Sequence, residues 1–261
     1  MKNSDQTEHA YVRLHSSIRT GTRKILLYLC TLFLKQTLMN TKKPVSRSII
    51  FFGPDSAGKS TQVRLLIRYL TSGKNRVARV WLRGRHSVAF VLSKFFVDLG
   101  YYRTLKVPSG VTYRVFDPSL LPGLKRVWGL VEFASVLPWI ILKVYFRRAL
   151  GYTIVAERYV VDTVAYLDYW LDSDFLKSVT ARALLGFIPR GSTLIHLTAE
   201  TQVLIERLKK VRYDTATLDF IVYQQKAYHV LSKALKTTTI DTSNTNIEAT
   251  FQLVKEALGI Q

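Results

Sequence analysis

The segment that constrains this chain most is a phosphate-binding loop behind an apolar run. Residues 48–53 read SIIFFG, a short run rich in β-formers that predicts a buried strand. Residues 53–61 read GPDSAGKST and fit the pattern G-x-x-x-x-G-K-[ST]. The glycines let the backbone curl so that its N–H groups point at phosphate oxygens, and the following helix presents its positive end. The segment therefore predicts an α/β domain that binds a nucleoside triphosphate.

Within this loop, two side chains are expected to contact the phosphates and their metal ion. Lys59 can reach the β- and γ-phosphates, and the Ser60 hydroxyl can ligate Mg²⁺. We therefore expect ATP and Mg²⁺ as cofactors. The remaining residues of the cradle are Gly53, Pro54, Asp55, Ser56, Ala57, Gly58 and Thr61. Because such loops serve many kinds of enzyme, the loop alone does not name the reaction.

The rest of the chain alternates between strand and helix patterns. Strands are expected at 48–53, 76–81, 152–156, 193–198 and 237–241. Helices are expected at 63–73, from 86 to 102, at 124–149 with a kink at Pro138, and at 162–171, 175–187, 200–210, 217–236 and 246–258. The prolines and glycines of 106–123 predict a loop. Alternation of this kind predicts a five-stranded parallel sheet covered by helices on both faces.

We expect one domain over residues 48–261, preceded by a basic extension over residues 1–47. The formal net charge of the 261 residues is +20, and it is unevenly spread. The extension carries nine basic residues against two acids, residues 74–150 carry fourteen against three, and residues 151–261 are balanced. Such a field attracts phosphate-bearing partners, although a basic surface without a specific partner is the alternative. Cys30 is the only cysteine, which excludes an intrachain disulfide and a four-cysteine metal site.

Two apolar stretches raise the question of a membrane. The ten residues 25–34 are too short to cross a bilayer, and are expected to form an interfacial helix or one docked on the domain. Residues 127–146 are long enough, but Glu132, Pro138 and Lys143 interrupt them, which favours a buried helix. We expect a cytoplasmic protein, with peripheral contact between these basic apolar regions and an anionic membrane as an alternative to a wholly soluble one.

Two further features bear on the reaction. Asp55 lies inside the phosphate loop, where a carboxylate suits a sugar hydroxyl of a second substrate better than a phosphate. Arg158 follows the strand at 152–156, at a strand end where open α/β sheets bind ligands. A guanidinium group there can clamp phosphates and stabilise charge during transfer. The alternative interpretation of Arg158 is a structural ion pair with a nearby acid.

Three segments resemble the thymidylate kinase family of nucleoside monophosphate kinases. They are GPDSAGKSTQ at 53–62, ERYVVDTVAY at 157–166 and HLTAETQVLIERLKKVRYD at 196–214. The resemblance covers residues 48–83 and 152–258 and is weak between 84 and 150, which we expect to be a divergent, helical acceptor-site region. It implies a three-layer fold around a five-stranded parallel sheet and transfer of the γ-phosphoryl group of ATP to a monophosphate, with dTMP to dTDP as the first expectation.

The resemblance also implies roles for single residues. Lys59 and Ser60 would hold the ATP phosphates and Mg²⁺, Asp55 would accept a hydrogen bond from the sugar 3′-hydroxyl, and Arg158 would bridge the two phosphates. Ser56 stands where some members carry a basic residue, so a catalytic cation is expected from a lid near 208–217. The candidates are Lys209, Lys210 and Arg212, for which a solvated helix end is the alternative, and Arg207 resembles the family arginine that contacts adenine.

The sequence departs from the family at several positions. Glu157 stands where an aspartate is usual, and it is expected to reach Mg²⁺ through water. Arg83 or Arg85 is expected to bind the acceptor phosphate. Phe133 is a candidate for stacking on the acceptor base, with a core role as the alternative. Tyr166 is expected at the acceptor site, with packing around the site as its alternative. No base-reading arginine is visible, so the acceptor base stays open.

Three hypotheses follow. The first is a nucleoside monophosphate kinase, with nucleotide substrates and with a homodimer through the apolar helices of 86–149, a monomer being the alternative. The second keeps the kinase chemistry but takes a lipid-linked or other phosphorylated metabolite, because of the apolar region 84–150 and the basic extension. The third is a phosphate-loop module that binds nucleic acid or a membrane, with ATP as a switch. The kinase hypotheses do not require nucleic acid.

Overall fold

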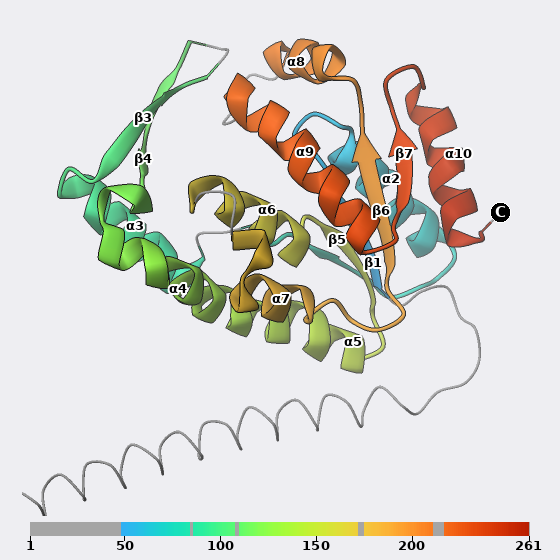
Figure 1. Cartoon of the computed structure of the whole chain (residues 1–261). Helices are drawn as coiled ribbons and strands as arrows, with labels where there is room; N and C mark the ends of the chain where they lie inside the picture. The colour runs from blue at the N-terminus through green and yellow to red at the C-terminus, as the bar shows by residue number, and fades with distance from the viewer. Residues whose placement is uncertain (1–47, 84–85, 108–109, 172–174, 211–216, 261) are drawn as a thin grey trace, which may run out of the picture. The chain divides into compact units, whose positions relative to one another are not determined.

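The computed structural model describes residues 48–83, 86–107, 110–171, 175–210 and 217–260. At its centre is a parallel sheet of five strands in the order β2-β5-β1-β6-β7 (Figure 1). The strands are β1 (Ser48–Phe52), β2 (Val77–Val80), β5 (Thr153–Glu157), β6 (Thr193–Thr198) and β7 (Thr238–Asp241). Helices flank the sheet, so the predicted fold class, an α/β domain with a five-stranded parallel sheet, is confirmed.

The helices connect these strands much as the sequence predicts. They are α2 (Lys59–Ser72), α3 (Ser87–Asp98), α4 (Pro122–Ile140), α5 (Arg147–Ala149), α6 (Val160–Trp170), α7 (Val179–Leu185), α8 (Thr201–Lys209), α9 (Leu218–Ala234) and α10 (Ile247–Leu258). Short 3₁₀ turns lie at Pro118–Leu120 and Phe175–Lys177, and the π-helical segment Ile141–Phe146 joins α4 to α5. The proposed extension 1–47 and most of the expected lid lie outside the described residues.

Strand β1 lies in the middle of the sheet and is buried on both faces. Its side chains alternate between two cores: Ile50 and Phe52 belong to one, and Ile49 and Phe51 to the other. A central parallel strand has no face exposed to solvent, which is why β1 is apolar from Ile49 to Phe52. The strand pairs with β5 on one side and β6 on the other, so the carboxyl ends of all three meet at one edge of the sheet. Ligands of open α/β sheets bind at that edge.

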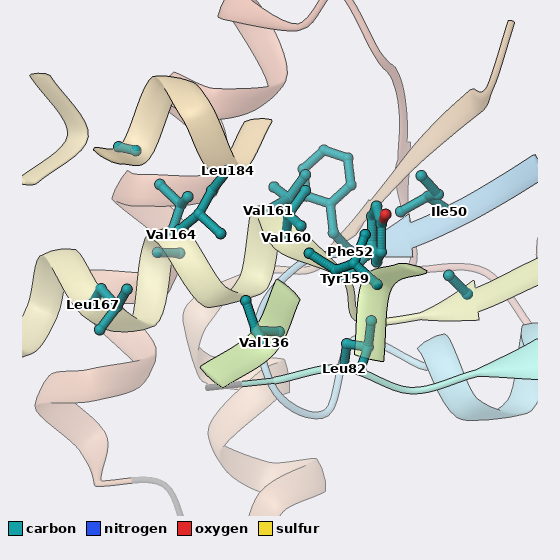
Figure 2. Packing of buried hydrophobic residues seen from close by; sticks show 14 of the residues in the cluster. Ile50, Phe52, Leu82, Val136, Tyr159, Val160, Val161, Val164, Leu167 and Leu184 are labelled. Atoms are coloured by element: carbon teal, nitrogen blue, oxygen red, sulfur yellow. The ribbon is translucent and has the colours of Figure 1, made fainter. Parts of the chain in front are cut away.

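The two cores fix the helices on the two faces of the sheet. On one face, Ile50 and Phe52 belong to a cluster with Val136 of α4, Val161 of α6 and Leu184 of α7 (Figure 2). On the other face, the apolar stripe of α2 and residues of α8, α10 and the start of α9 cover the sheet. The loop between β1 and α2 is thus held between two packed layers.

The prediction of a loop over 106–123 is wrong in its middle. Thr112–Phe116 forms strand β4, which pairs antiparallel with β3 (Tyr102–Lys106), and α3 ends at Asp98 instead of running to Tyr102. The hairpin is anchored by Phe116, whose ring stacks on Phe96 at 5.1 Å and meets Trp128 edge-on at 4.8 Å. The region 84–150 is therefore not wholly helical. Proline and glycine on either side of the short strand hid its alternation.

The long helix predicted at 124–149 is present. Pro138 lies inside α4, and the departure from α-helical geometry follows it, in the π-helical segment Ile141–Phe146. In the described part of the chain, one helix, Pro122–Ala149, is long and apolar enough to cross a membrane by length and composition. In its most apolar window 39% is buried inside the fold, and Ile140 and Val144 belong to the core.

Candidate active site

The phosphate loop turns sharply between β1 and α2. Gly53 has a φ of +138°, and a Cβ atom there would lie 2.0 Å from the carbonyl oxygen of Leu197 on the neighbouring strand. Gly58 has a φ of +85° and is the N-cap of α2. Both glycines are needed, the first for a close approach of two backbones and the second for a left-handed turn. The loop therefore leads directly into the N-terminus of α2. The free backbone N–H groups and the positive end of the helix at that point favour a bound anion.

Lys59 is buried and folded against its own loop. Its Nζ donates to the carbonyl oxygen of Gly53 at 2.7 Å and to that of Pro54. Burial, together with the positive charge of Arg158, lowers the pKa of Lys59 to about 7. Near neutral pH the amine is thus poised between its charged and neutral forms. A bound polyphosphate would favour the ammonium ion and draw it away from the two carbonyl groups.

Binding of a nucleoside triphosphate should therefore take up a proton at mildly alkaline pH. At about pH 8 the Lys59 amine is mostly neutral before binding, and the phosphates restore its charge, so we expect uptake of close to one proton per ligand bound. Calorimetry with a non-hydrolysable ATP analogue, in two buffers of different ionisation enthalpy, measures this uptake.

Two controls test whether Lys59 is the group that takes up the proton. At about pH 6 the amine is already charged, and the uptake should vanish. Lys59→Arg, which stays charged, should show none at either pH. Equal uptake in the unaltered protein and in Lys59→Arg would contradict the assignment.

Asp55 sits at the mouth of the loop between two arginines. Its carboxylate accepts hydrogen bonds from Arg158 and, at 3.4 Å, from Arg83. Gln224 of α9 accepts from the Asp55 amide at 3.0 Å and donates to the carboxylate at 3.4 Å. Burial by itself would raise the pKa of Asp55, but the charges of Arg158, Arg83 and Lys59 outweigh it and hold that pKa far below the usual range. Asp55 is therefore ionised and keeps two guanidinium groups beside the loop.

Arg158 is held in an uncommon backbone conformation, with a φ of +68°. Its amide donates to the Phe51 carbonyl oxygen at 3.0 Å, which fixes it at the ends of β1 and β5. Its guanidinium pairs with Asp55 and lies 3.6 Å from Asp162, so the ion pair considered from the sequence is present. Nevertheless Nη1 is buried and has no hydrogen-bond partner among the described residues. The group can therefore still donate to a ligand.

Asp162, the second acid beside Arg158, is itself fixed from two sides. Its carboxylate accepts from the Tyr228 hydroxyl at 2.9 Å and from the Tyr159 amide at 3.2 Å. Burial raises the pKa of Asp162, although the charge of Arg158 acts in the opposite direction. Asp162 therefore acts as a rigid support that positions the guanidinium from the side of α6.

Glu157 and Ser60 form the group of oxygen atoms that fits a metal ion. Glu157 ends β5, and its carboxylate accepts from the Ser60 hydroxyl and from Arg79 of β2. Burial would raise the pKa of Glu157, but the hydrogen bonds from Ser60 and Arg79 lower it on balance, so the group is ionised. A carboxylate and a hydroxyl are hard oxygen donors, and Mg²⁺ at phosphates commonly uses one or two carboxylates. The side chain of Glu157 is one methylene longer than that of an aspartate, and its carboxylate still contacts the Ser60 hydroxyl. Among the described residues, no group of three or more His, Cys, Asp or Glu side chains is arranged to hold a metal ion.

A pocket of about 620 Å³ opens beside the loop. One wall is the loop and the start of α2, and the opposite wall comes from the segment between β7 and α10. Arg207 of α8 lines it and donates to Thr242, at 2.9 Å to the hydroxyl and 2.7 Å to the carbonyl oxygen. The pocket is lined by Asp55, Ser56, Gly58, Lys59, Ser60, Thr61, Gln62, Arg83, Arg158, Arg207, Leu208, Thr242, Thr245, Asn246, Ile247 and Thr250.

The structure brings most of the predicted site residues to this pocket. Gly53, Pro54 and Ala57 complete the loop behind it, and the Tyr166 ring lies beside Arg83, whose guanidinium carbon is 5.9 Å from the ring centroid. Phe133 does not line the pocket; it packs against Phe187 with ring centroids 5.9 Å apart, as the core alternative expects. Lys209 and Lys210 lie exposed at the end of α8, also outside the lining. Arg85 and Arg212 lie outside the described residues.

Three contributors to the site had no signal in the sequence. Gln224 reaches Asp55 from the middle of α9, Thr242 holds Arg207 from the end of β7, and Arg79 holds Glu157 from β2. Each of these contacts joins residues that lie far apart in the chain, so no local sequence pattern predicts it. The position of Arg79 can be explained once the fold is known, because Arg79 occupies the one exposed position of β2, a strand that is otherwise largely buried.

Comparison with known proteins shows a likeness of fold. No protein-family model matches the sequence, and neither does any curated protein. The structure is similar to the crystal structure of thymidylate kinase from Ehrlichia chaffeensis, with a TM-score of 0.52 and 16% sequence identity, over 83% of this chain and all of that one. At this identity the likeness shows the fold alone, an α/β fold with a five-stranded parallel sheet flanked by helices.

Proposed function

We propose that this protein transfers the γ-phosphoryl group of ATP to a phosphate-bearing acceptor, and that a nucleoside monophosphate, dTMP first, is that acceptor. The observation that carries the proposal is the position of Arg158. It pairs with Asp55 of the phosphate loop and lines the same pocket as Lys59 and Arg83, and its Nη1 has no hydrogen-bond partner among the described residues. A cation that shares a pocket with two other anion-binding groups, the phosphate loop and Arg83, suits the transfer of a phosphoryl group from one phosphate to another.

The site separates a donor side from an acceptor side. Lys59 and the loop amides would bind the ATP phosphates, and Ser60 and Glu157 would hold Mg²⁺, which supplies charge neutralisation when bound. On the acceptor side, Arg83 would bind the incoming phosphate, and the ionised Asp55 would accept a hydrogen bond from a sugar hydroxyl. Transfer of this kind depends on positioning and charge stabilisation, and needs little covalent chemistry from the protein.

The remaining roles are assigned as part of the same proposal. Arg207, on the far wall of the pocket, would contact the adenine. Lys209, Lys210 or Arg212 would supply a further cation from a lid near 208–217 that closes over the phosphates and excludes water. The fold likeness to a protein named as a thymidylate kinase supports a nucleotide kinase.

A second acceptor class is favoured by one observation. Phe133, the residue considered for stacking on the acceptor base, packs on Phe187 and lies outside the pocket lining. In the part of the chain that the structure describes, the acceptor side therefore offers a charged group, Arg83, with the Tyr166 ring beside it, but not the predicted stacker Phe133. A phosphate carried by a lipid or another metabolite would satisfy that arrangement equally well.

The test is ADP formation from Mg-ATP with a panel of nucleoside monophosphates, compared with Lys59→Ala. We expect turnover with dTMP or dUMP, and its loss in the variant, because the amine contacts the transferred charge. ATP-analogue binding to the unaltered protein shows in parallel that the loop is competent. If the analogue binds and no monophosphate is phosphorylated, the nucleotide acceptor is wrong and phosphorylated lipids become the next panel. If the analogue does not bind, the kinase proposal itself fails.

A further inference from the structure

Helix α3 is apolar on its outer side. The side chains that point away from the domain are large, and Val91 and Phe95 remain 65% and 55% exposed. Its inner side buries Ala89 and Ser93, and Leu92 and Phe96 pack partly buried against the core. A surface helix normally carries large apolar residues inward and polar residues outward, whereas this helix is apolar on both sides. The exposed apolar residues of this helix and its end are Val88, Phe90, Val91, Phe95 and Leu99.

The helix next to it is likewise apolar on both its inner and its outer side. Helix α4 packs beside α3, and the Ala89 amide donates to the Ser135 hydroxyl at 2.9 Å between them. Trp128, Val136 and Ile140 are buried on α4, whereas Leu142 and Phe146, in the π-helical segment that follows, are each 56% exposed. The two helices lie side by side at the end of the domain away from β7 and α10 (Figure 1). The exposed apolar residues of this second helix are Val127, Leu130, Trp139, Ile141, Leu142, Phe146 and Leu150. We call both sets together the outer apolar face.

Cations outnumber acids in the segment that carries this face. Residues 87–149 contain nine Lys and Arg against three acids. Asp117 is buried and paired with Arg103 at 2.8 Å, and Glu132 is buried, so Asp98 is the single exposed acid of this segment. The basic residues of the segment are Lys94, Arg103, Lys106, Arg114, Lys125, Arg126, Lys143, Arg147 and Arg148.

We propose that the outer apolar face docks on an anionic lipid surface. Apolar side chains flanked by Lys and Arg are the features by which a helix lies in a membrane interface. The inner side of the Pro122–Ala149 helix belongs to the protein core, so the helix would lie along the bilayer surface without crossing it. Trp81 and Trp139 are both partly exposed, as is common for tryptophan at the level of the head groups.

The charge distribution favours lipid over a second copy of the chain. In a twofold dimer the same patch faces itself, so its cations would meet cations with only Asp98 to offset them. Anionic head groups attract the same cations, and each Lys or Arg near the membrane surface adds to the free energy of binding. The inference rests on this surface alone, independently of the catalytic proposal.

The experiment is vesicle co-sedimentation of the full-length protein. The probes are vesicles of phosphatidylcholine alone and of equal parts phosphatidylcholine and phosphatidylserine. We expect binding to the mixed vesicles, and a fall of about tenfold or more in the partition coefficient for the double variant Val91→Glu/Phe95→Glu. The matched control is Val230→Glu/Leu253→Glu, which changes the charge equally at exposed apolar positions of α9 and α10 and should bind far better.

A second pair of variants and a salt series separate apolar insertion from charge alone. Lys94→Glu/Arg147→Glu keeps the apolar side chains and should lower binding to the mixed vesicles by about tenfold or more. In about 1 M salt, where charges are screened beyond about 3 Å, the unaltered protein should still bind more than Val91→Glu/Phe95→Glu. Affinity for the ATP analogue should stay unchanged in every variant, which shows that the domain is folded.

Three outcomes would overturn the proposal. The first is absence of binding to the mixed vesicles. The second is equal loss in Val91→Glu/Phe95→Glu and in its matched control, because the overall charge would then account for the binding. The third is a dimer that Val91→Glu/Phe95→Glu dissociates while vesicle binding is unaffected, because the face would then be an interface between two copies. Light scattering on the same samples measures that last case.

Discussion

Replacing Arg158 by alanine should lower phosphoryl transfer by about 10³-fold or more, the range for an arginine that stabilises charge in such reactions. The variant removes the guanidinium group that pairs with Asp55 of the phosphate loop and lines the pocket together with Lys59 and Arg83. The loop itself should keep its shape, because Asp55 retains Arg83 and Gln224, and Asp162 retains Tyr228. The measurement is kcat and KM for ATP and the acceptor, together with affinity for the ATP analogue.

Two further variants make the result specific. Arg158→Lys keeps the charge but loses the planar fork, so it should recover only part of the activity. Arg76→Ala removes an equally large arginine from a place away from the pocket, where it lies 4.3 Å from the centroid of the Tyr152 ring, and its turnover should be unchanged. Arg158→Ala with unaltered turnover would show that the guanidinium is a structural ion pair and would remove it from the mechanism.

Gly53→Ala should lower the free energy of unfolding by about 3 kcal/mol or more, a large value for one methyl group. The added Cβ would lie 2.0 Å from the Leu197 carbonyl oxygen, and the φ of +138° is strained for any residue with a side chain. The obstacle is backbone in the sheet, so it cannot move aside as a flexible side chain would. Denaturant unfolding measures the change, and phosphoryl transfer should be lost as well because the cradle is displaced.

Gly151→Ala is the matched control for that prediction. Its φ is +82°, and nothing lies within 4 Å of an added Cβ, so the substitution introduces backbone strain without a collision. We expect a loss of about 1–2 kcal/mol, the usual cost of a left-handed residue with a side chain. Equal losses in the two variants would mean that strain alone acts at Gly53 and that the approach to Leu197 is relieved by small shifts of the strands.

The centre of the sheet was predictable because strands β1, β5 and β6 are buried or half-buried on both faces. They combine apolar residues with β-formers, as in SIIFF at 48–52 and TLIHLT at 193–198, and the turn residues beside them mark their ends. Strand β4 was not predictable in the same way. Of its five residues only Phe116 is buried, and the prolines and glycine around it carry the stronger local signal. Its pairing with β3 depends on the contact of Phe116 with Phe96 and Trp128, which lie on two different helices.

The site was predictable where one segment carries it and unpredictable where distant segments meet. The loop from Gly53 to Thr61 and the Glu157–Arg158 pair follow strands, so their type and position in the sequence sufficed. Of the two candidates Arg83 and Arg85, the structure describes Arg83 alone and places it against Asp55. Gln224 lies on α9, and its two hydrogen bonds to Asp55 arise only when that helix packs on the sheet.

The central position of β1 has a consequence during synthesis of the protein. Its partners β5 and β6 begin more than a hundred residues later in the chain, at Thr153 and Thr193. At translation rates of about 5–20 residues per second, the nascent strand waits on the order of ten seconds for its first neighbour. Contacts of such long sequence separation also slow folding itself. The most apolar strand of the domain is thus the one exposed longest to chaperones, and the nucleotide cradle attached to it forms only when the sheet closes around it.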